Sequence, residues 1–238
     1  ERQGHDHGTA LARDLGYTPV YLHYNSGRHI STNGREFADQ LEILVANWPV
    51  AVKELAILGH SMGGLLARSA WHYGTAADHT WPRRLKKLVF LGTPHHGAPM
   101  ERGGNLIDIA LGVSPYTAPL SRLGKIRSAG ITDLRHTWLL DEDWRGRDRF
   151  ARSSGHHAAV PLPDGVKCFA IDATTGKQAG HIKDRLVGDG LVPLASALGC
   201  HAEHDRNLMF PPDRQWIALE TGHLDLLCRK PVYERIRG

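Results

Sequence analysis

At 238 residues, 41% of them hydrophobic, the chain is long enough to bury one sizeable core, and we expect residues 1–238 to form a single domain. The net charge of +4, from 29 Lys and Arg against 25 Asp and Glu, is too small an excess to indicate a nucleic-acid-binding protein. No stretch approaches the about 18 apolar residues of a transmembrane helix, so we expect a soluble chain.

Helical and strand-like patterns alternate through the first part of the chain. Residues 9–15 predict a short helix that ends at Gly16, and the β-branched and aromatic run at 20–24 predicts a strand. Asn33, with Glu36 three residues later, predicts the start of a second helix. Its apolar face recurs at helical spacing, with Phe37, Leu41, Leu44, Val45 and Trp48, and Pro49 stops it. Strands are predicted over 55–58 and 88–91, with a third helix between them that reaches Tyr73.

After residue 91 the alternation is interrupted, and strands are predicted again at 166–171 and 215–219, with a final helix from Val232. We expect residues 100–165 to form a lid or cap insertion, including a short helix over 106–111, because ordinary connections are much shorter. Its apolar residues either line an acyl pocket or form a subdomain core: Leu106, Ile107, Ile109, Leu111, Trp138, Leu139 and Leu140. The alternating pattern predicts an α/β fold with a doubly wound, mostly parallel sheet covered on both faces.

The sequence Gly-His-Ser-Met-Gly-Gly at 59–64 joins the strand at 55–58 to the third helix. This strand, sharp turn and helix present a serine at the tip, as in a nucleophile elbow. Gly59 and Gly63 are expected to let the strand and the helix approach closely. The amide of Met62, at the start of the helix, is expected to stabilise an oxyanion. Ser61 is therefore the candidate nucleophile.

A nucleophilic serine needs a histidine base and an orienting carboxylate, in the chain order Ser, Asp or Glu, His. His223 follows the last predicted strand in a glycine-containing loop and is the candidate base. Two carboxylates follow the strand at 166–171: Asp189, in a glycine-bracketed loop, and Asp172, at the end of the strand itself. We favour Asp189 and keep Asp172 as the alternative. Two further histidines are candidates for lining the pocket: His60 and His95.

The cysteines, the pattern of charges and the N-terminal residues indicate which cofactors, surfaces and compartment to expect. Cys168, Cys200 and Cys228 show no C-x-x-C spacing, so we expect neither a metal site nor a disulfide framework, and a serine nucleophile requires no cofactor. Acidic and basic residues interleave over 122–152, which predicts a solvated face with a weak, transient attraction to an anionic membrane surface. No signal peptide is present, which leaves the compartment open and favours a cytoplasmic over a secreted protein.

Four stretches carry a resemblance: the turn at 59–64, the segment at 91–99, the loop at 188–193, and Gly222-His223. Together they resemble the α/β-hydrolases, and most of all the bacterial lipases and the GPI inositol-deacylase-like proteins. The likeness spans about residues 17 to 233 and is least diagnostic over 100–165. It implies that Ser61, Asp189 and His223 are nucleophile, acid and base, and that the substrate is a carboxylic ester of a small molecule or a lipid.

The resemblance also implies core strands upstream of residue 20, one of them followed by a loop that donates the second oxyanion amide. The sequence shows no such strands, so we expect the N-terminal strands to be missing and these residues to be a poorly active fragment with an exposed sheet edge. The same three residues would also serve a thioesterase, an amidase or an acyltransferase. A hydrolase fold used only for binding is the alternative outside enzymes.

Overall fold

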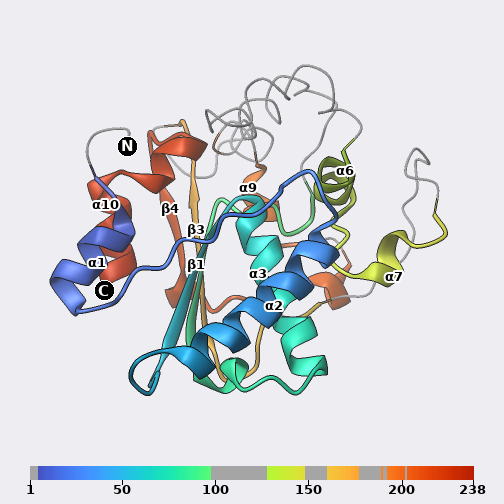
Figure 1. Ribbon diagram of the computed structural model, residues 1–238. Helices are drawn as coiled ribbons and strands as arrows, with labels where there is room; N and C mark the ends of the chain where they lie inside the picture. The colour runs from blue at the N-terminus through green and yellow to red at the C-terminus, as the bar shows by residue number, and fades with distance from the viewer. Residues whose placement is uncertain (1–4, 98–127, 148–159, 177–188, 190–191, 202) are drawn as a thin grey trace.

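The computed structural model describes residues 5–97, 128–147, 160–176, 189, 192–201 and 203–238 (Figure 1). The strands are β1 (Leu55–His60), β2 (Leu85–Leu91), β3 (Lys167–Ala173) and β4 (Gln215–Ala218). The α-helices are α1 (His7–Leu15), α2 (Ile30–Asn47), α3 (Met62–Ala76), α6 (Ala129–His136), α7 (Asp141–Trp144), α9 (Leu194–Ala197) and α10 (Lys230–Arg237). Four 3-10 turns are described: η2 (Trp81–Arg84), η5 (His204–Arg206), η6 (Pro212–Arg214) and η7 (His223–Leu227).

The four described strands form one parallel sheet in the order β1-β2-β3-β4. Side chains of β2 alternate between two hydrophobic clusters, as the pleat of a strand requires. Leu88 and Phe90 pack with Ala67 and Ala70 of α3 on one face. Val89 and Leu91 pack with Leu226 and Val232 on the other face, a second set that includes α10.

Helices cover both faces of this sheet. In Figure 1, α2 and α3 lie together on one side of the strands, and α1 and α10 lie together on the other. The Tyr233 hydroxyl of α10 donates to the Asp14 carboxylate of α1 over 2.6 Å, which ties the second pair together. The predicted α/β fold with a parallel sheet covered on both faces is therefore confirmed.

The prediction of a strand over 20–24 is wrong. These residues connect α1 to α2 without any regular structure, and Val20 and Tyr21 are 59% and 65% exposed. A strand needs a neighbour that takes up its backbone hydrogen bonds. In the part of the chain that is described, β1 pairs only with β2, and nothing pairs with 20–24.

The second helix begins at Ile30 rather than at Asn33, the start predicted from the sequence. Asn33 lies within the first turns of α2, and its side-chain amide donates to the Asn25 carbonyl over 2.8 Å. A carboxylate from a distant segment caps the helix instead: the Ile30 N–H donates to Asp133 Oδ2 over 2.7 Å. The N-terminus of α2 is thus set by a tertiary contact that local spacing does not reveal.

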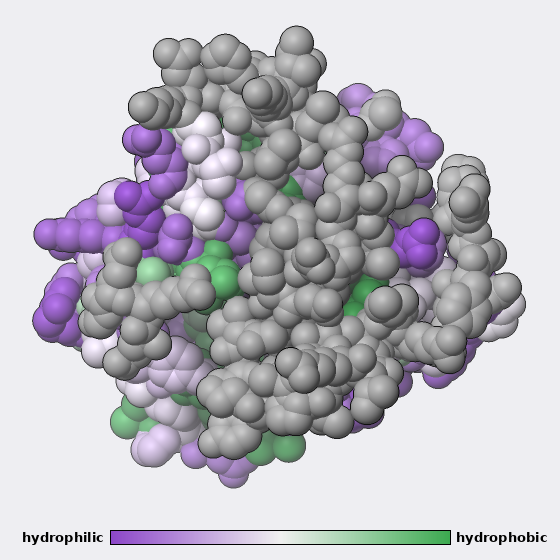
Figure 2. All heavy atoms as spheres, turned by 90° about the horizontal axis from the view of Figure 1, so that it is seen from above, coloured by the Kyte–Doolittle hydropathy of each residue, from purple (hydrophilic) through white to green (hydrophobic). Residues whose placement is uncertain are grey.

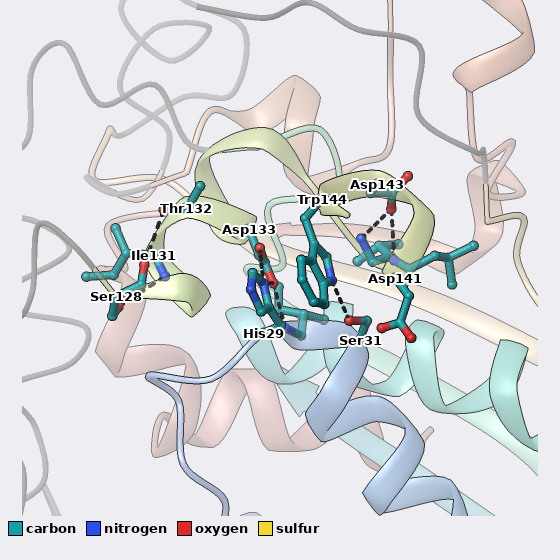
Figure 3. Close-up of polar contacts among 12 residues, drawn as sticks. His29, Ser31, Ser128, Ile131, Thr132, Asp133, Asp141, Asp143 and Trp144 are labelled. Atoms are coloured by element: carbon teal, nitrogen blue, oxygen red, sulfur yellow. Dashed lines mark hydrogen bonds and ion pairs between the residues drawn. The ribbon is translucent and has the colours of Figure 1, made fainter. Parts of the chain in front are cut away.

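Residues 128–147 of the predicted insertion are fastened to the start of α2 (Figure 3). His29 lies between Asp133 and Trp144, with its Nδ1 3.0 Å from Asp133 Oδ1 and its ring stacked on the indole. The Trp144 indole N–H donates to the Ser31 hydroxyl over 2.9 Å. Other parts of that insertion, including the helix predicted over 106–111, lie outside the described residues. No described helix is both long and apolar enough to cross a membrane.

Candidate active site

Ser61 stands on a sharp turn between β1 and α3. Its backbone has φ 54° and ψ −126°, a left-handed conformation that non-glycine residues seldom adopt outside special turns. The Ser61 N–H donates to the Leu91 carbonyl at the end of β2 over 2.9 Å, which fixes the turn to the neighbouring strand. The predicted strand, turn and helix around this serine are therefore present.

The glycines that allow the close approach of β1 and α3 are not the two that were expected from the sequence. A Cβ on Gly59 would lie 2.8 Å from the Gly64 Cα, and a Cβ on Gly64 would overlap the Thr93 side chain. A Cβ on Gly63 would meet no described atom within 4 Å. Gly59 and Gly64 therefore permit the close approach of strand and helix, and the role expected for Gly63 is wrong.

The structure brings His223 and Asp189 together. His223 Nδ1 lies 2.5 Å from Asp189 Oδ2, and the backbone N–H of His223 donates to the Asp189 carbonyl over 3.3 Å. The other carboxylate oxygen of Asp189 accepts from the Val192 N–H over 2.9 Å. Both side chains are buried, each residue being 3% exposed. The glycines that flank Asp189 lie outside the described residues.

Asp172, the alternative carboxylate, is in a different situation. It is fully buried near the end of β3, and neither of its carboxylate oxygens is hydrogen-bonded to a described residue. Burial raises the pKa of Asp172 well above its ordinary value, and the negative charge of Asp189 raises it further. Of the two candidates, Asp189 is the one that contacts His223.

Gly92 makes room for this pair, a role that the sequence did not suggest. It follows β2 with φ 54°, and its N–H donates to the Ile171 carbonyl of β3 over 2.9 Å. A Cβ here would lie 3.0 Å from both Asp189 Oδ2 and the His223 ring carbon Cε1. A side chain at this position would push the carboxylate and the imidazole apart.

The two histidines expected to line a pocket occupy different places. His60, the last residue of β1, is part-buried against His223, with ring centroids 4.5 Å apart. His95 is 1% exposed and packs against Phe90 and Phe210 in the core, with Nδ1 3.3 Å from the Arg68 guanidinium. Burial lowers the pKa of His95 well below its ordinary value.

His223 presents a free ring nitrogen toward the interior. Its Nε2 is buried and has no hydrogen-bond partner among the described residues, so it is not yet bonded to the Ser61 hydroxyl. Met62 is the first residue of α3, and an N–H in the first turn of a helix has no acceptor within the helix. His223 thus lies against His60, the residue before Ser61, and near Gly92, at the carboxyl ends of β1 and β2.

Apolar side chains surround the start of α3. Met62 and Leu65 form a cluster with Leu139, Leu140 and Val160. From the sequence, Leu139 and Leu140 could have lined an acyl pocket or belonged to a core. In the structure they pack in the core next to Met62, the residue after the candidate nucleophile. Seen from above, hydrophobic surface of described residues adjoins strongly hydrophilic surface at this end of the molecule (Figure 2).

Other potential sites lie apart from this one. A cavity of about 480 Å³ is lined by Leu85 and Lys86 at the start of β2, which places it at the opposite end of the sheet from Ser61. Among the described residues, no group of three or more His, Cys, Asp or Glu side chains could hold a metal ion. The three cysteines, all within the described residues, form no disulfide; Cys200 is exposed and the other two are buried.

The family follows from a sequence comparison. The profile of the family described as "PGAP1-like alpha/beta domain" matches residues 4–163, more than half of the chain. The chain belongs to this PGAP1-like family. Membership in it confirms the predicted place in the α/β-hydrolase superfamily. A comparison with curated protein sequences found no match.

Solved structures resemble the PGAP1-like chain at low sequence identity. Lipase BlEst2 from Bacillus licheniformis, in mature form, is 15% identical with a TM-score of 0.55, covering 98% of this chain and 84% of that one. Its propeptide form is 16% identical with a TM-score of 0.55, covering 98% and 46%. Phospholipase PlaB from Legionella pneumophila is 17% identical with a TM-score of 0.45, covering 80% and 41%. The chain and the Bacillus lipase share a fold.

Proposed function

We propose that this chain is a serine hydrolase that cleaves carboxylic esters through an acyl-enzyme intermediate, with Ser61 as nucleophile, His223 as base and Asp189 as orienting acid. The observation that carries the proposal is the 2.5 Å contact between Asp189 and His223, beside a serine on a strained turn. A carboxylate on Nδ1 keeps the proton there and leaves Nε2 free to accept one. The buried, unpartnered Nε2 of His223 fits that role.

In the first step, Ser61 Oγ forms a bond to the ester carbonyl carbon while its proton passes to His223 Nε2. The carbonyl oxygen takes up the electron pair of the broken π bond, and the Met62 N–H stabilises the resulting oxyanion. The bond to the alcohol oxygen then breaks, and His223 returns the proton to the departing alcohol. Asp189 stabilises the imidazolium that exists in between.

In the second step, a water molecule replaces the alcohol. Its oxygen bonds to the acyl carbon while one of its protons passes to His223 Nε2. The bond to Ser61 Oγ then breaks, the proton returns to that oxygen, and a carboxylic acid leaves. Side chains, one amide and water supply every group that moves a proton or an electron pair, so the route requires neither a metal nor an organic cofactor.

The substrate class rests on two further points. A solved structure that shares the fold is named a lipase, and the candidate nucleophile stands at the edge of a buried apolar core, so the protein beside it is apolar. An ester with an apolar acyl group, on a lipid or a small molecule, is therefore the substrate we propose. Transient contact with a membrane surface would bring the enzyme to a lipid ester. Thioesters, amides and transfer to an alcohol are the rival reactions, because the three residues do not select the leaving group or the acceptor.

Ser61→Ala is the test of this function. We expect it to abolish covalent labelling by a fluorophosphonate and to lower the kcat for p-nitrophenyl butyrate on the order of 10⁶-fold, the loss typical of a missing serine nucleophile. Ser26→Ala, in the loop before α2, is the matched control and should label like the wild type. Labelling of Ser61→Ala at the wild-type rate would refute the nucleophile. A wild type that neither labels nor hydrolyses esters would favour the non-catalytic fold.

A further inference from the structure

His60 is joined to both halves of the candidate active site. It is covalently adjacent to Ser61, and its Nε2 lies 3.0 Å from the carbonyl oxygen of His223. Because a carbonyl oxygen only accepts hydrogen bonds, Nε2 must carry the proton in this contact. Residues 163 positions apart in the chain are therefore linked by a single side chain.

The contact acts on the backbone and on the ring of His223 together. His223 opens the short turn η7, whose first carbonyl is the one that His60 binds. The two imidazole rings also touch, with centroids 4.5 Å apart and planes tilted by 46°. Asp189 holds Nδ1 of the same ring from the other end, over 2.5 Å. Between them, the two contacts restrain where Nε2 of His223 points.

The anchor at His60 is electrically neutral. Burial and, to a smaller extent, the neighbouring His223 lower the pKa of His60 to about 3. A cation at this position would oppose the imidazolium that forms on His223 during the reaction. A neutral imidazole donates the same hydrogen bond without that repulsion.

We propose that His60 is a positioning residue that sets the distance and the orientation between the Ser61 hydroxyl and His223 Nε2 by holding the His223 carbonyl. The proposal assigns His60 a role other than lining the pocket, and its catalytic meaning rests on the proposed function. A merely packed ring could be replaced by any side chain of similar volume. A positioning donor can be replaced only by a side chain that also donates.

Three variants separate these roles. His60→Leu and His60→Met keep volume without the donor, and the second serves if the first does not fold. His60→Gln keeps an N–H near the position of Nε2 without the ring. His72→Leu, half-buried on α3 against Tyr73, is the matched control for losing a histidine.

The first readout is the downfield proton resonance of His223 Nδ1–H in NMR spectra, identified by its absence in His223→Gln. We expect the donor-free variants to broaden or shift this resonance, whereas His60→Gln and His72→Leu keep it. The second readout is steady-state kinetics. The donor-free variants should lose about fivefold to tenfold in kcat, the rate equivalent of one hydrogen bond, with KM within about twofold of the wild type, and His60→Gln should recover most of it.

Two outcomes would overturn the proposal: a folded donor-free variant that keeps both the resonance and kcat, or a His60→Gln variant as impaired as His60→Leu. The resonance needs no turnover, so the proposal and the proposed function can fail separately. A wild type without esterase activity whose resonance depends on His60 would refute the hydrolase and support the positioning. An active wild type whose resonance and kcat are both unchanged by the loss of the His60 donor would support the hydrolase and refute the positioning.

Discussion

At the scale of single residues, the candidate site is a set of close contacts between backbone turns. Ser61 and Gly92 both take up positive φ angles of 54°, one after β1 and the other after β2. Glycine adopts such a φ freely, whereas for a non-glycine residue such as Ser61 it costs on the order of 1–3 kcal/mol and persists only where the surroundings impose it. Here the Ser61 N–H bonds to the Leu91 carbonyl, next to Gly92, so the two turns impose their geometry on each other.

The two carboxylates can be told apart by amide substitution. Asp189→Asn should lower kcat on the order of 10⁴-fold, because an amide on Nδ1 favours the wrong tautomer of His223. Asp172→Asn should keep kcat within about tenfold, because burial and the neighbouring negative charge raise the pKa of that carboxyl and so already favour its uncharged form. Ester hydrolysis by both purified variants is the measurement. Full activity of Asp189→Asn together with an inactive Asp172→Asn would reverse the assignment.

Some of the candidate site could be predicted from the sequence, and some of its contacts could not. Ser61, Asp189 and His223 could be selected because their order and their loops follow from the winding of the chain. The contacts of Gly92 and His60 depend on the register between strands, in which His60 pairs with Leu91. Register is set by the hydrophobic pattern of the paired strands and by turn geometry, and the spacing of residues within one motif does not reveal it.

At the scale of elements, the structure replaces a local helix cap with a distant one. Asp133 of α6 is fully buried and accepts from the first N–H of α2, and its other oxygen faces His29 (Figure 3). A carboxylate at a helix N-terminus also meets the favourable end of the helix dipole. Segment 128–147 is thereby bound to the helix that covers one face of the sheet.

Asp133→Ala should lower the free energy of unfolding by about 1–3 kcal/mol, because it leaves the Ile30 N–H buried without an acceptor. Urea denaturation followed by circular dichroism measures the change. Glu36→Ala, on the same helix, breaks a half-exposed ion pair with Arg28, which precedes the helix, and should cost less than about 1 kcal/mol. Equal losses in the free energy of unfolding would show that the Asp133 cap stabilises the protein no more than the surface ion pair does.

The prediction of helices and strands succeeded where residues close in sequence determine the element. It failed where the element needs a neighbouring strand. The helix ending at Gly16 is present because that glycine adopts φ 72° and closes the turn on Ala12. Strand propensity at 20–24 is equally clear in the sequence, yet propensity alone supplies no hydrogen-bonding neighbour.

At the scale of the whole molecule, buried histidines dominate the response to acid. Burial lowers the pKa of His7, of His95, of His60 to about 3 and of His96 to about 4. An unfolded chain would protonate these groups near pH 6.5, so it binds more protons than the folded chain below that pH. Two acids act in the opposite sense: burial raises the pKa of Asp133 to about 6 and that of Asp172 well above its ordinary value.

We therefore expect the free energy of unfolding to fall as the pH falls from 7.5 to 5, by at least about 1.4 kcal/mol, the equivalent of one pKa unit at one group. The four histidines outnumber the two acids, whose contributions favour the folded state as the pH falls. Urea midpoints at several pH values, at constant ionic strength, give the slope. A free energy that stays level or rises toward pH 5 would mean that the acids outweigh the histidines.

The sequence separation of 163 between His60 and His223 also has a consequence for the stage of folding at which the candidate site is complete. Ser61 and Leu91, whose carbonyl fixes its turn, belong to one strand-helix-strand unit, whereas His223 follows β4, so its contacts with that unit close a much longer loop. A partly folded chain would thus carry a strained serine with no base beside it. Under the proposed function, such partly folded copies would be unable to activate Ser61, so hydrolysis would be restricted to molecules whose sheet is complete.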